Sequence, residues 1–549
     1  MSHVPPLPLT PLLPQISLLS STTSSFILLV CLISHLLLPL NPVKELVKLQ
    51  CVESPSGRGT LSSLAVLFTF ELTCNSPHPA SIHILDNDSL FNIFYLYRPA
   101  IFDGDESNLV HIKGGKGWDR ERWWHKLAHV CRRWRILILG SASSLGLCLV
   151  CTWGTPVADM LAHSPPLPII IDYFNLRLGV TEEAEEGIIL ALKQRDRVCR
   201  IRFGMGVRNM KELIMAIDEE YPVLEYLVME NTRELTRTTL ILSETFQAPR
   251  LRHVLLFGFA IPMGSRLLTT AAGLDMLALG IAHPSAYFQP NSLLQWLSSM
   301  PQLEKLLIVF AAPISDPDVE GQLMHPPAME HISLPNLRWI EFQGVSDYME
   351  AFVHRIVTPR LENLYIQFFE RLPFSVSSLL QFLSATDTFK FDSAQFEFSK
   401  NLVYVGAYLR EEAETHPFSI TVYSKSLDMQ VSSVAQIFNS LSQIFSTVEH
   451  ITLELEELYE EHNEVDRAKW RRLLRSLVQV KTLHVDDGLV QELSRSLRPN
   501  DGENPLELLP ELQELTYSGS DNVGDVFTSF IDARQNAGRP VACQWSALV

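Results

Sequence analysis

A short phrase of the form P-x-L-x-x-L-x-L returns along most of this 549-residue chain and limits its fold more than any other feature. Six copies keep the proline, at Pro222, Pro249, Pro301, Pro335, Pro359 and Pro510. Four copies lack it and begin at Asp196, Ala272, Ser446 and Val478. The first five copies follow one another at steps of 23 to 29 residues, and later steps stretch to 32 or 34 residues. A period sustained in this way indicates repeated units that stack on one another.

Each copy has the pattern of a buried strand. Its last two apolar positions alternate along the strand and point inward, and the residue between them points outward. Helices are expected between copies, at 291–299, 376–383, 434–445 and 465–477. The spacing is typical of leucine-rich repeats. We therefore predict an α/β fold, an irregular right-handed leucine-rich-repeat solenoid with a curved parallel sheet, in which strands 227–229, 306–308, 340–342 and 364–366 share one sheet. An ordinary α/β domain whose strands start Pro-x-Leu remains the alternative.

Composition argues against two broad classes of protein. Lys and Arg number 44 against 62 Asp and Glu, which gives a net charge of -18. Such a chain repels a phosphate backbone unless a separate basic patch overrides the repulsion, so we expect no nucleic-acid partner. The eight cysteines are too sparse for the disulfide framework of a small secreted domain. We expect free, buried thiols and a cytoplasmic or nuclear location.

Residues 1–78 form an apolar extension rich in Pro, Leu and Ser. Its longest apolar run, 26–40, is interrupted by His35 and Pro39, and no Lys or Arg precedes it. A signal peptide needs a positive start, and a spanning helix needs roughly 20 apolar residues. We predict a disordered or loosely packed extension and no membrane anchor. A membrane-anchored binding protein, with Lys44 and Lys48 as flanking charges, remains an alternative.

Residues 79–150 are expected to form a small helical unit, which leaves 151–549 to the solenoid. Apolar residues at helical spacing in 89–97 predict a short helix with Asp88 as its N-cap. Glycines and prolines in 98–117 predict a loop insertion. From Asp119 onward, apolar spacing that includes Trp123 and Trp134 predicts a further helix with a basic outer face.

This helical unit resembles an F-box. The segment LDNDSLFNIF at 85–94 is similar to the opening of an F-box, and LAHVCRRWRIL at 127–137 is similar to its closing helix. The run 129–173 resembles F-box-like proteins of mushroom-forming fungi, which are predicted ubiquitin-ligase adaptors with leucine-rich-repeat-like C-terminal halves. The resemblance implies apolar contacts with the adaptor subunit of a cullin ligase. The positions that it assigns to these contacts are Leu85, Leu90, Ile93, Phe94, Leu127, Val130, Cys131 and Trp134.

The chain departs from the family pattern at three places. Asp86 stands where the family usually has Pro, and Ser89 stands where the family has an apolar residue. The insertion 98–117 separates helices that a compact F-box joins by a short turn. These departures keep a second interpretation open, a repeat scaffold that no longer couples to a ligase.

The sequence lacks the common catalytic signatures G-x-S-x-G, H-E-x-x-H and G-x-x-x-x-G-K-[ST]. We therefore expect no enzyme activity, no cofactor and no metal. A zinc site has a candidate ligand set in His129, Cys131, Cys148 and Cys151. However, the last two lie in an apolar strand-like run that points them to opposite faces, which favours free thiols.

Two charged segments are interpreted as solvated helix faces. The basic cluster 113–135 contains interleaved tryptophans, as nucleic-acid surfaces do, but a basic amphipathic helix has the same pattern. The basic residues of 465–477 follow a run of acids, and this order suits a helix dipole at the protein surface.

Together these patterns predict a substrate-recruiting adaptor that breaks and forms no bonds. The helical unit docks a cullin ligase, and the concave sheet face holds a target protein of unknown identity. The predicted target-binding residues are outward strand positions, namely Tyr226, His253, Lys305, Trp339, Glu341, Asn363 and Tyr365. Trp339 and Tyr365 come from adjacent copies and are expected to form one amphipathic patch, unless a loop or helix covers them.

Overall fold

The computed structural model describes residues 85–98, 122–174, 180–231, 240–281, 286–310, 331–369, 376–386, 388–412, 416–456, 466–500, 503–519 and 526–547. The predicted extension 1–78 and residues 99–117 of the predicted loop insertion lie outside this part. The chain divides into two compact units, Met1–Leu147 and Cys148–Val549. Each unit is described by itself.

The described part of the first unit is helical. Its helices are α2 (Asn87–Tyr97), α3 (Trp123–Ala128), α4 (Arg132–Gly140) and α5 (Ala142–Leu145). Leu90, Phe94, Trp134 and Ile138 are buried in its core. The rings of Phe94 and Trp134 meet edge to face with 4.9 Å between their centroids, so α2 and α4 share one apolar contact.

The helix predicted from Asp119 onward is two helices, because the chain turns at 129–131. Cys131 is extended, and its Sγ accepts a hydrogen bond from the Trp134 backbone N–H at 3.5 Å, so it caps α4. Val130, one of the positions that the resemblance assigns to ligase contacts, lies in the turn and is 45% exposed. Apolar spacing does not distinguish one helix from two that bury the same side.

Helix α2 begins two residues earlier than predicted, and Asp86 rather than Asp88 is its N-cap. The Asp86 carboxylate accepts hydrogen bonds from the Ser89 backbone N–H at 2.7 Å and from the Ser89 hydroxyl at 3.1 Å. Two of the departures from the F-box pattern thus have a local physical role, since a capped first turn is more stable than an uncapped one. Arg133 of α4 donates to the Leu85 carbonyl at 2.6 Å and ties α4 to the start of α2.

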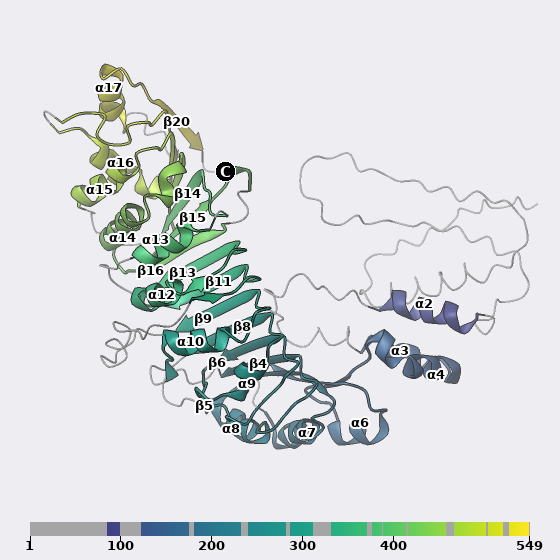
Figure 1. The fold of residues 1–549 in the computed structure, drawn as a ribbon. Coiled ribbons are helices and arrows are strands. Elements are labelled where there is room, and N and C mark those ends of the chain that lie inside the picture. The colour runs from purple at the N-terminus through teal and green to yellow at the C-terminus, as the bar shows by residue number, and fades with distance from the viewer. Residues whose placement is uncertain are drawn as a thin grey trace, which may run out of the picture. The chain divides into compact units, whose positions relative to one another are not determined.

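The second unit is built on one sheet of sixteen strands, drawn in Figure 1. In spatial order the strands are β1 (Leu149–Cys151), β2 (Ile169–Phe174), β3 (Val198–Met205), β4 (Tyr226–Asn231), β6 (His253–Phe257), β8 (Met276–Ile281), β9 (Lys305–Phe310), β11 (Trp339–Gly344), β13 (Asn363–Phe368), β16 (Phe418–Tyr423), β15 (Leu402–Tyr408), β14 (Ser393–Phe398), β17 (His450–Leu455), β18 (Thr482–Val485), β19 (Glu514–Gly519) and β20 (Ala542–Ala547). Two small sheets pair β5 (Leu240–Ile241) with β7 (Phe259–Ala260) and β10 (Ile332–Ser333) with β12 (Ile356–Val357).

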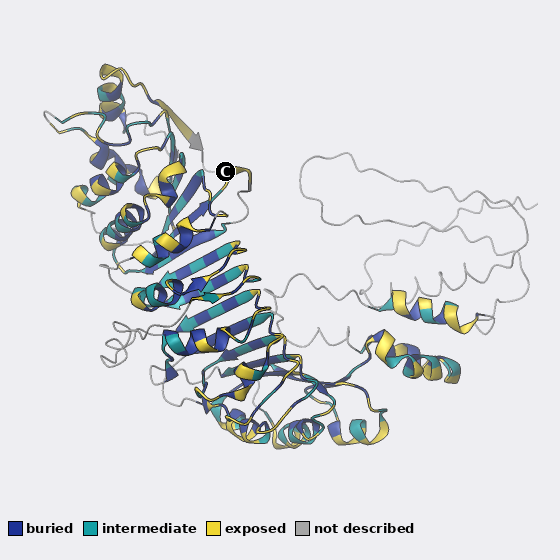
Figure 2. Cartoon of the chain, viewed as in Figure 1, coloured by how far each residue is buried: buried dark blue, intermediate teal, exposed yellow. Residues whose placement is uncertain are grey.

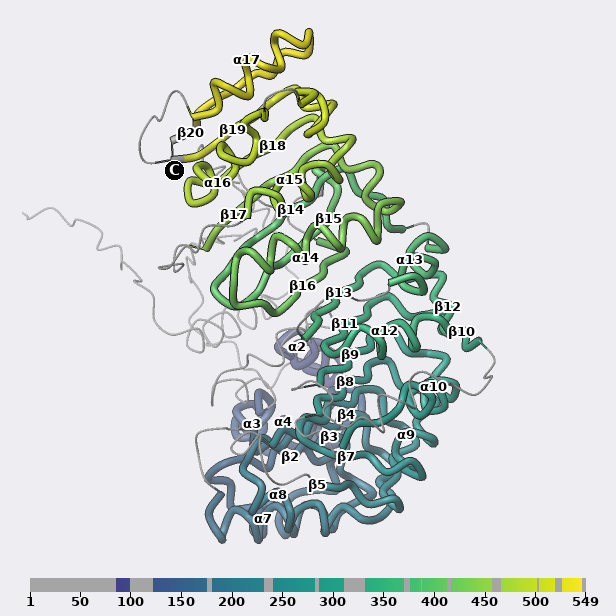
Figure 3. Tube along the Cα trace, turned by 90° about the vertical axis from the view of Figure 1, so that its left-hand side faces the viewer, coloured from purple at the N-terminus to yellow at the C-terminus, as the bar shows by residue number. Residues whose placement is uncertain are grey.

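Helices alternate with the strands and lie along one face of the sheet (Figures 1 and 3). They are α6 (Val157–His163), α7 (Glu182–Leu192), α8 (Val207–Ala216), α9 (Arg266–Thr270), α10 (Pro290–Leu297), α12 (Ser346–Val353), α13 (Ser377–Ser384), α14 (Leu427–Ser440), α15 (Arg467–Ser476), α16 (Asp487–Leu497) and α17 (Thr528–Asn536). Short 3-10 turns form η4 (Arg410–Glu412) and η5 (Ile444–Thr447). The four helices predicted from the sequence correspond to α10, α13, α14 and α15.

The predicted repeat is confirmed, because each of the ten phrases leads into a strand of the large sheet. The four strands predicted to share one sheet are β4, β9, β11 and β13, and they do so. Along β13, Leu364, Ile366 and Phe368 are buried while the residues between them are partly exposed. Figure 2 shows this alternation along the central strands. The second unit is therefore a leucine-rich-repeat-like α/β scaffold with helices on the buried face.

The sheet is mostly parallel, as predicted, and the exception among the described strands lies at β14–β16. β15 pairs antiparallel with both β14 and β16. β16 lies parallel to β13, and β14 lies parallel to β17, so the three strands fill the place between two regular repeats. The physical reason is the short connection at 399–401, where the Ser399 N–H donates to the Leu402 carbonyl at 2.9 Å. A connection of this length turns the chain back on itself, whereas a parallel pair needs a long crossover.

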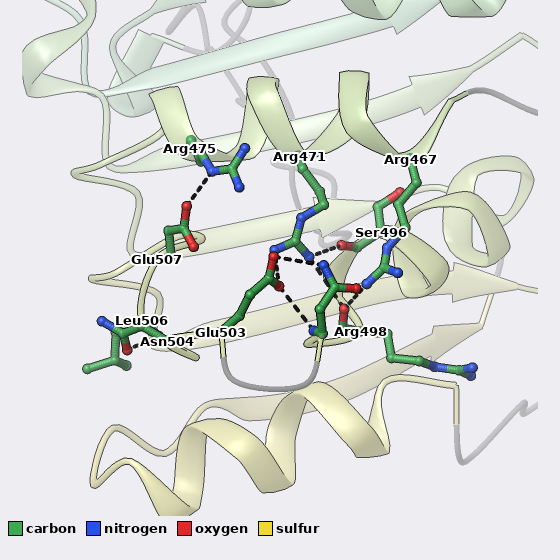
Figure 4. A network of polar contacts seen from close by, with 10 residues as sticks. Arg467, Arg471, Arg475, Ser496, Arg498, Glu503, Asn504, Leu506 and Glu507 are labelled. Atoms are coloured by element: carbon green, nitrogen blue, oxygen red, sulfur yellow. Dashed lines mark hydrogen bonds and ion pairs between the residues drawn. The ribbon is translucent and has the colours of Figure 1, made fainter.

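Helix α15 is only in part the solvated basic helix that its charges predict, because Arg472 and Arg475 are exposed but Arg471 is not. Trp470 is fully buried, and Arg471 is 6% exposed. The Arg471 guanidinium donates to the Ser496 carbonyl at 3.1 Å and forms an ion pair with Glu503 at 2.5 Å, as Figure 4 shows. Arg475 pairs with Glu507 at 2.7 Å in the same figure. These arginines bind the loop after α16, and a sequence pattern does not reveal such partners because they lie about 30 residues away.

Candidate functional site

The candidate site lies on the face of the sheet opposite the helices, which we call the open face. Its side chains form rows, because neighbouring parallel strands place equivalent residues side by side. One row contains Lys305, Trp339 and Asn363, and the next contains Glu341 and Tyr365. The structure therefore brings five of the seven predicted target-binding residues together on three adjacent strands.

The other two predicted target-binding residues form a separate pair. Tyr226 and His253 lie side by side on β4 and β6, with 5.6 Å between ring centroids. Strand β8 separates them from Lys305 on β9. Val228, another outward position of β4, is only 5% exposed, so the open face is not equally accessible along its length.

A hollow of about 370 Å³ lies in the open face where β11, β13 and β16 meet. It is lined by Trp339, Glu341, Phe342, Gln343, Tyr365, Ile366, Gln367, Ser419 and Thr421. The lining combines aromatic faces, one carboxyl, two amides and three hydroxyls. A concave site with a few converging polar groups of this kind is suited to binding rather than to packing alone.

Trp339 and Tyr365 form the aromatic wall predicted for adjacent repeats. Their ring centroids are 4.7 Å apart, and their planes are inclined by 41°. Both residues are partly exposed, and the Tyr365 hydroxyl donates to Asn363 Oδ1 at 3.4 Å. Tryptophan and tyrosine are the residues most often found at the energetic centre of protein interfaces.

The carboxyls of the open face are held in an unfavourable environment. Burial raises the pKa of the Glu341 carboxyl, although the Trp339 indole N–H, which donates to it, lowers that pKa. Burial also raises the pKa of Glu397 on β14, and the negative charges of Glu454 and Glu456 raise it further. The ionised form of each carboxyl is thus less favourable in the folded chain than in water.

The antiparallel strands supply site residues that sequence reasoning missed. Tyr404 of β15 lies opposite Thr421 of the hollow, and its hydroxyl contacts His416 Nδ1 at 2.8 Å. Burial raises the pKa of Tyr404 to about 12 and lowers the pKa of His416, so both groups are neutral at pH 7. The available signal was the alternation of apolar with polar or aromatic residues in 402–408 and 418–423, which lacks the leucine phrase.

The residues assigned to ligase contacts by resemblance fall into two groups. Six of them, Leu85, Leu90, Ile93, Phe94, Leu127 and Trp134, are at most 8% exposed and pack within the first unit. Val130 is largely exposed, and Cys131 is the cap of α4. Exposed apolar side chains that the resemblance does not assign are Tyr95, Leu96 and Ile136, which are 57%, 77% and 61% exposed.

Within the described part of the chain, no group of three or more His, Cys, Asp or Glu side chains is placed to hold a metal ion. Cys131, Cys148, Cys151, Cys199 and Cys543 form no disulfide among the described residues. Cys151 is buried as expected, whereas Cys131, Cys148 and Cys199 are partly exposed and Cys543 is exposed. The side-chain hydrogen bond to Cys148 and burial raise the pKa of the Cys199 thiol. Of the basic cluster, Arg135 donates to the Ala128 carbonyl at 3.1 Å and so stabilises the turn before α4.

None of the helices in the described residues has the length and apolar character needed to cross a membrane. No protein-family model matches the chain, and no curated protein matches it. Among solved structures, the chain is similar to the leucine-rich repeat-containing protein LegL7 from Legionella pneumophila. The two share 13% sequence identity over 72% of this chain and 98% of that one, with a TM-score of 0.23.

Proposed function

We propose that this chain is a non-enzymatic recruiting protein whose repeat unit binds a target protein on the open face. The observation that carries this proposal is the hollow between β11 and β16, where Trp339, Glu341 and Tyr365 converge. A rigid sheet holds these side chains, so little side-chain conformational freedom is lost on binding. The target is a protein, because aromatic anchors ringed by amides and hydroxyls suit an interface with a polypeptide.

The finer proposal is that the first unit couples the chain to a cullin-based ubiquitin ligase. The F-box-like residues of 85–94 and 127–137 support it, as do the exposed apolar side chains of Leu96, Val130 and Ile136. Exposed apolar groups on a small helical unit mark an interaction surface. The ligase would transfer ubiquitin, and this chain would raise the effective concentration of the target.

A scaffold without ligase coupling is the second candidate. The observation that favours it is the burial of six of the eight positions that the resemblance assigns to ligase contacts. These residues hold the first unit together, so the F-box pattern would persist for structural reasons alone. The third candidate, a membrane-anchored binding protein, depends on residues 26–40, which lie outside the described part.

Replacing Trp339 and Tyr365 together with alanine is expected to abolish target capture. The double variant removes the aromatic wall of the hollow, and truncating a central aromatic anchor costs about 2 kcal/mol or more of binding free energy. Affinity purification of the tagged full-length chain, with quantitative mass spectrometry, measures the captured proteins. Trp545→Ala is the matched control, since Trp545 is 40% exposed on β20, far along the sheet. Unchanged capture by a folded double variant would place the recognition surface elsewhere.

Replacing Leu96 and Val130 with aspartate is expected to remove the cullin adaptor subunit from the same purification while target capture persists. Both side chains are exposed, so the change adds charge to the surface and leaves the core intact. Trp134→Ala is a poorer test, because removing a 2%-exposed tryptophan costs on the order of 3 kcal/mol and unfolds the unit. If the adaptor never co-purifies with the unaltered chain, the scaffold without ligase coupling is the correct function.

A further inference from the structure

The open face between β9 and β17 carries an excess of negative charge. Its outward side chains on these seven strands include three glutamates, Glu341, Glu397 and Glu454, and one lysine, Lys305. None of the ion pairs found within the described residues neutralises these three carboxylates. Glu397 and Glu454 lie directly opposite each other on β14 and β17. Like charges in that position destabilise a sheet.

One hydrogen bond offsets this cost only in part. Gln395 Nε2 donates to Glu454 Oε2 at 2.7 Å. An amide donor carries no net charge, so it stabilises a carboxylate less than a cation does. Two adjacent carboxylates therefore remain on the open face and repel each other. A cation that binds between them would relieve this repulsion.

Aromatic rings lie between the two carboxylate positions. Tyr365 and Tyr404 belong to the central strands β13 and β15, and Tyr408 lies farther along β15. The Tyr404 ring lies against Gly406, where an added Cβ would stand 2.8 Å from the ring edge. Residue 406 must therefore be glycine for the Tyr404 ring to take this position. Rings beside carboxylates favour Arg and Lys, since the negative face of a ring attracts a cation.

We propose that the open face from β11 to β17 binds an extended polypeptide segment that carries two basic side chains. One basic side chain reaches Glu341 between Trp339 and Tyr365, and the other reaches Glu397 and Glu454 beside Tyr404. This inference rests on the proposed function, and it names the chemistry of the target segment. β11 and β14 are four strand positions apart, which corresponds to about 19 Å, or about six residues of extended chain.

Charge complementarity selects this occupant over two others. A nucleic acid would place phosphates against three carboxylates, which repel them. A neutral saccharide would stack on the rings but would leave the carboxylates without a counter-charge. Only a cationic segment relieves the cost of the partly buried Glu341 carboxylate and of the Glu397–Glu454 juxtaposition together.

The test uses the full-length chain and synthetic twelve-residue peptides of Ala, Ser and Tyr. One peptide carries two arginines six residues apart, a second carries them adjacent, and a third carries citrulline in place of both arginines. Citrulline keeps the shape of arginine and lacks its charge. Fluorescence anisotropy at low salt is expected to show the first peptide binding at least tenfold tighter than the third and measurably tighter than the second. Equal affinity for the arginine and citrulline peptides, or no peptide binding, overturns the proposal.

The paired variant Glu341→Gln with Glu397→Gln removes both charges with little change of shape. Its affinity for the two-arginine peptide is expected to fall at least tenfold. The control is Glu183→Gln with Glu212→Gln, which changes net charge equally at two exposed helix positions. Glu341→Gln is also expected to raise the melting temperature of the free chain, because burial disfavours the charged carboxyl. Equal loss of affinity in both paired variants means that net charge alone drives binding, which overturns the proposal.

Capture of the native target separates this inference from the proposed function. If the Trp339 and Tyr365 double variant loses the target and the glutamine pair keeps it, the open face binds its target without recognising cations, and only this inference fails. If neither variant changes the captured proteins, the proposed function itself fails.

Discussion

Replacing Asp172 with alanine is expected to lower the free energy of unfolding of the repeat unit by about 4 kcal/mol, one of the two largest single-site effects that we predict. Asp172 and Arg202 are adjacent on β2 and β3 and are 3% and 7% exposed. Their carboxylate and guanidinium form an ion pair at 3.1 Å, and Asp172 also accepts the Phe174 backbone N–H at 2.9 Å. Removing the carboxylate leaves a buried cation without this counter-charge, which is why the cost is large.

The matched control replaces both partners with apolar residues of similar size, Asp172→Leu with Arg202→Met. The free energy of unfolding of this double variant is expected to lie within about 1 kcal/mol of that of the unaltered chain, because neither charge of the pair is then left buried. Urea unfolding, with hydrogen exchange followed in peptides from 169–205, measures both variants. A double variant as unstable as Asp172→Ala would show that the site depends on shape or backbone contacts rather than on the charge pair.

Replacing Arg534 with alanine is expected to lower the free energy of unfolding of the C-terminal repeat by about 4 kcal/mol. The Arg534 side chain of α17 is fully buried. Its guanidinium donates to the carbonyls of Leu509, Pro510 and Leu512 at 3.1, 3.1 and 3.0 Å. Leu509 has a φ of 50°, a left-handed conformation that is strained for a leucine. The arginine therefore stabilises a strained turn. Its buried guanidinium supplies hydrogen-bond donors to three backbone carbonyls.

Hydrogen exchange in peptides from 503–519 and 526–547 measures this local effect. Protection is expected to fall there in Arg534→Ala while β2 to β13 keep theirs, since repeats interact mainly with their neighbours. Arg539→Ala is the control, because Arg539 is exposed and makes only a surface ion pair with Glu511 at 3.4 Å. That change is expected to alter stability by less than about 1 kcal/mol. Uniform loss of protection along the whole sheet would contradict this account.

Part of the binding surface could be predicted from sequence because strand geometry is regular. A repeated phrase places Trp339 and Tyr365 at equivalent outward positions on adjacent strands, so their contact follows from the register alone. Glu341 follows by the same reasoning, two positions after Trp339. The place of Ser419 and Thr421 in the hollow could not be predicted in this way. They belong to β16, which lacks the leucine phrase and whose neighbours in the sheet are set by a reversal of the chain.

Local sequence also predicted helices better than it predicted their ends and surfaces. The apolar spacing around Trp134 indicated helix, but the break at Cys131 depends on one side-chain hydrogen bond. The charges of α15 indicated a solvated surface, but Arg471 is buried because a distant loop supplies Ser496 and Glu503 as partners. The cap at Cys131 is a local hydrogen bond that apolar spacing does not report. The partners of Arg471 lie outside the window in which periodicity operates.

The sequence by itself determined the repeat architecture, since ten apolar phrases at regular spacing can bury their inward residues only by stacking into one sheet. It also determined which residues of each phrase face outward, because side chains alternate along a strand. Tertiary structure alone decided the order of β14, β15 and β16 and therefore which side chains meet across the open face. The reason is physical: alternation acts between neighbours in sequence, whereas strand order, burial of charge and the shape of a hollow depend on residues that the chain brings together from far apart.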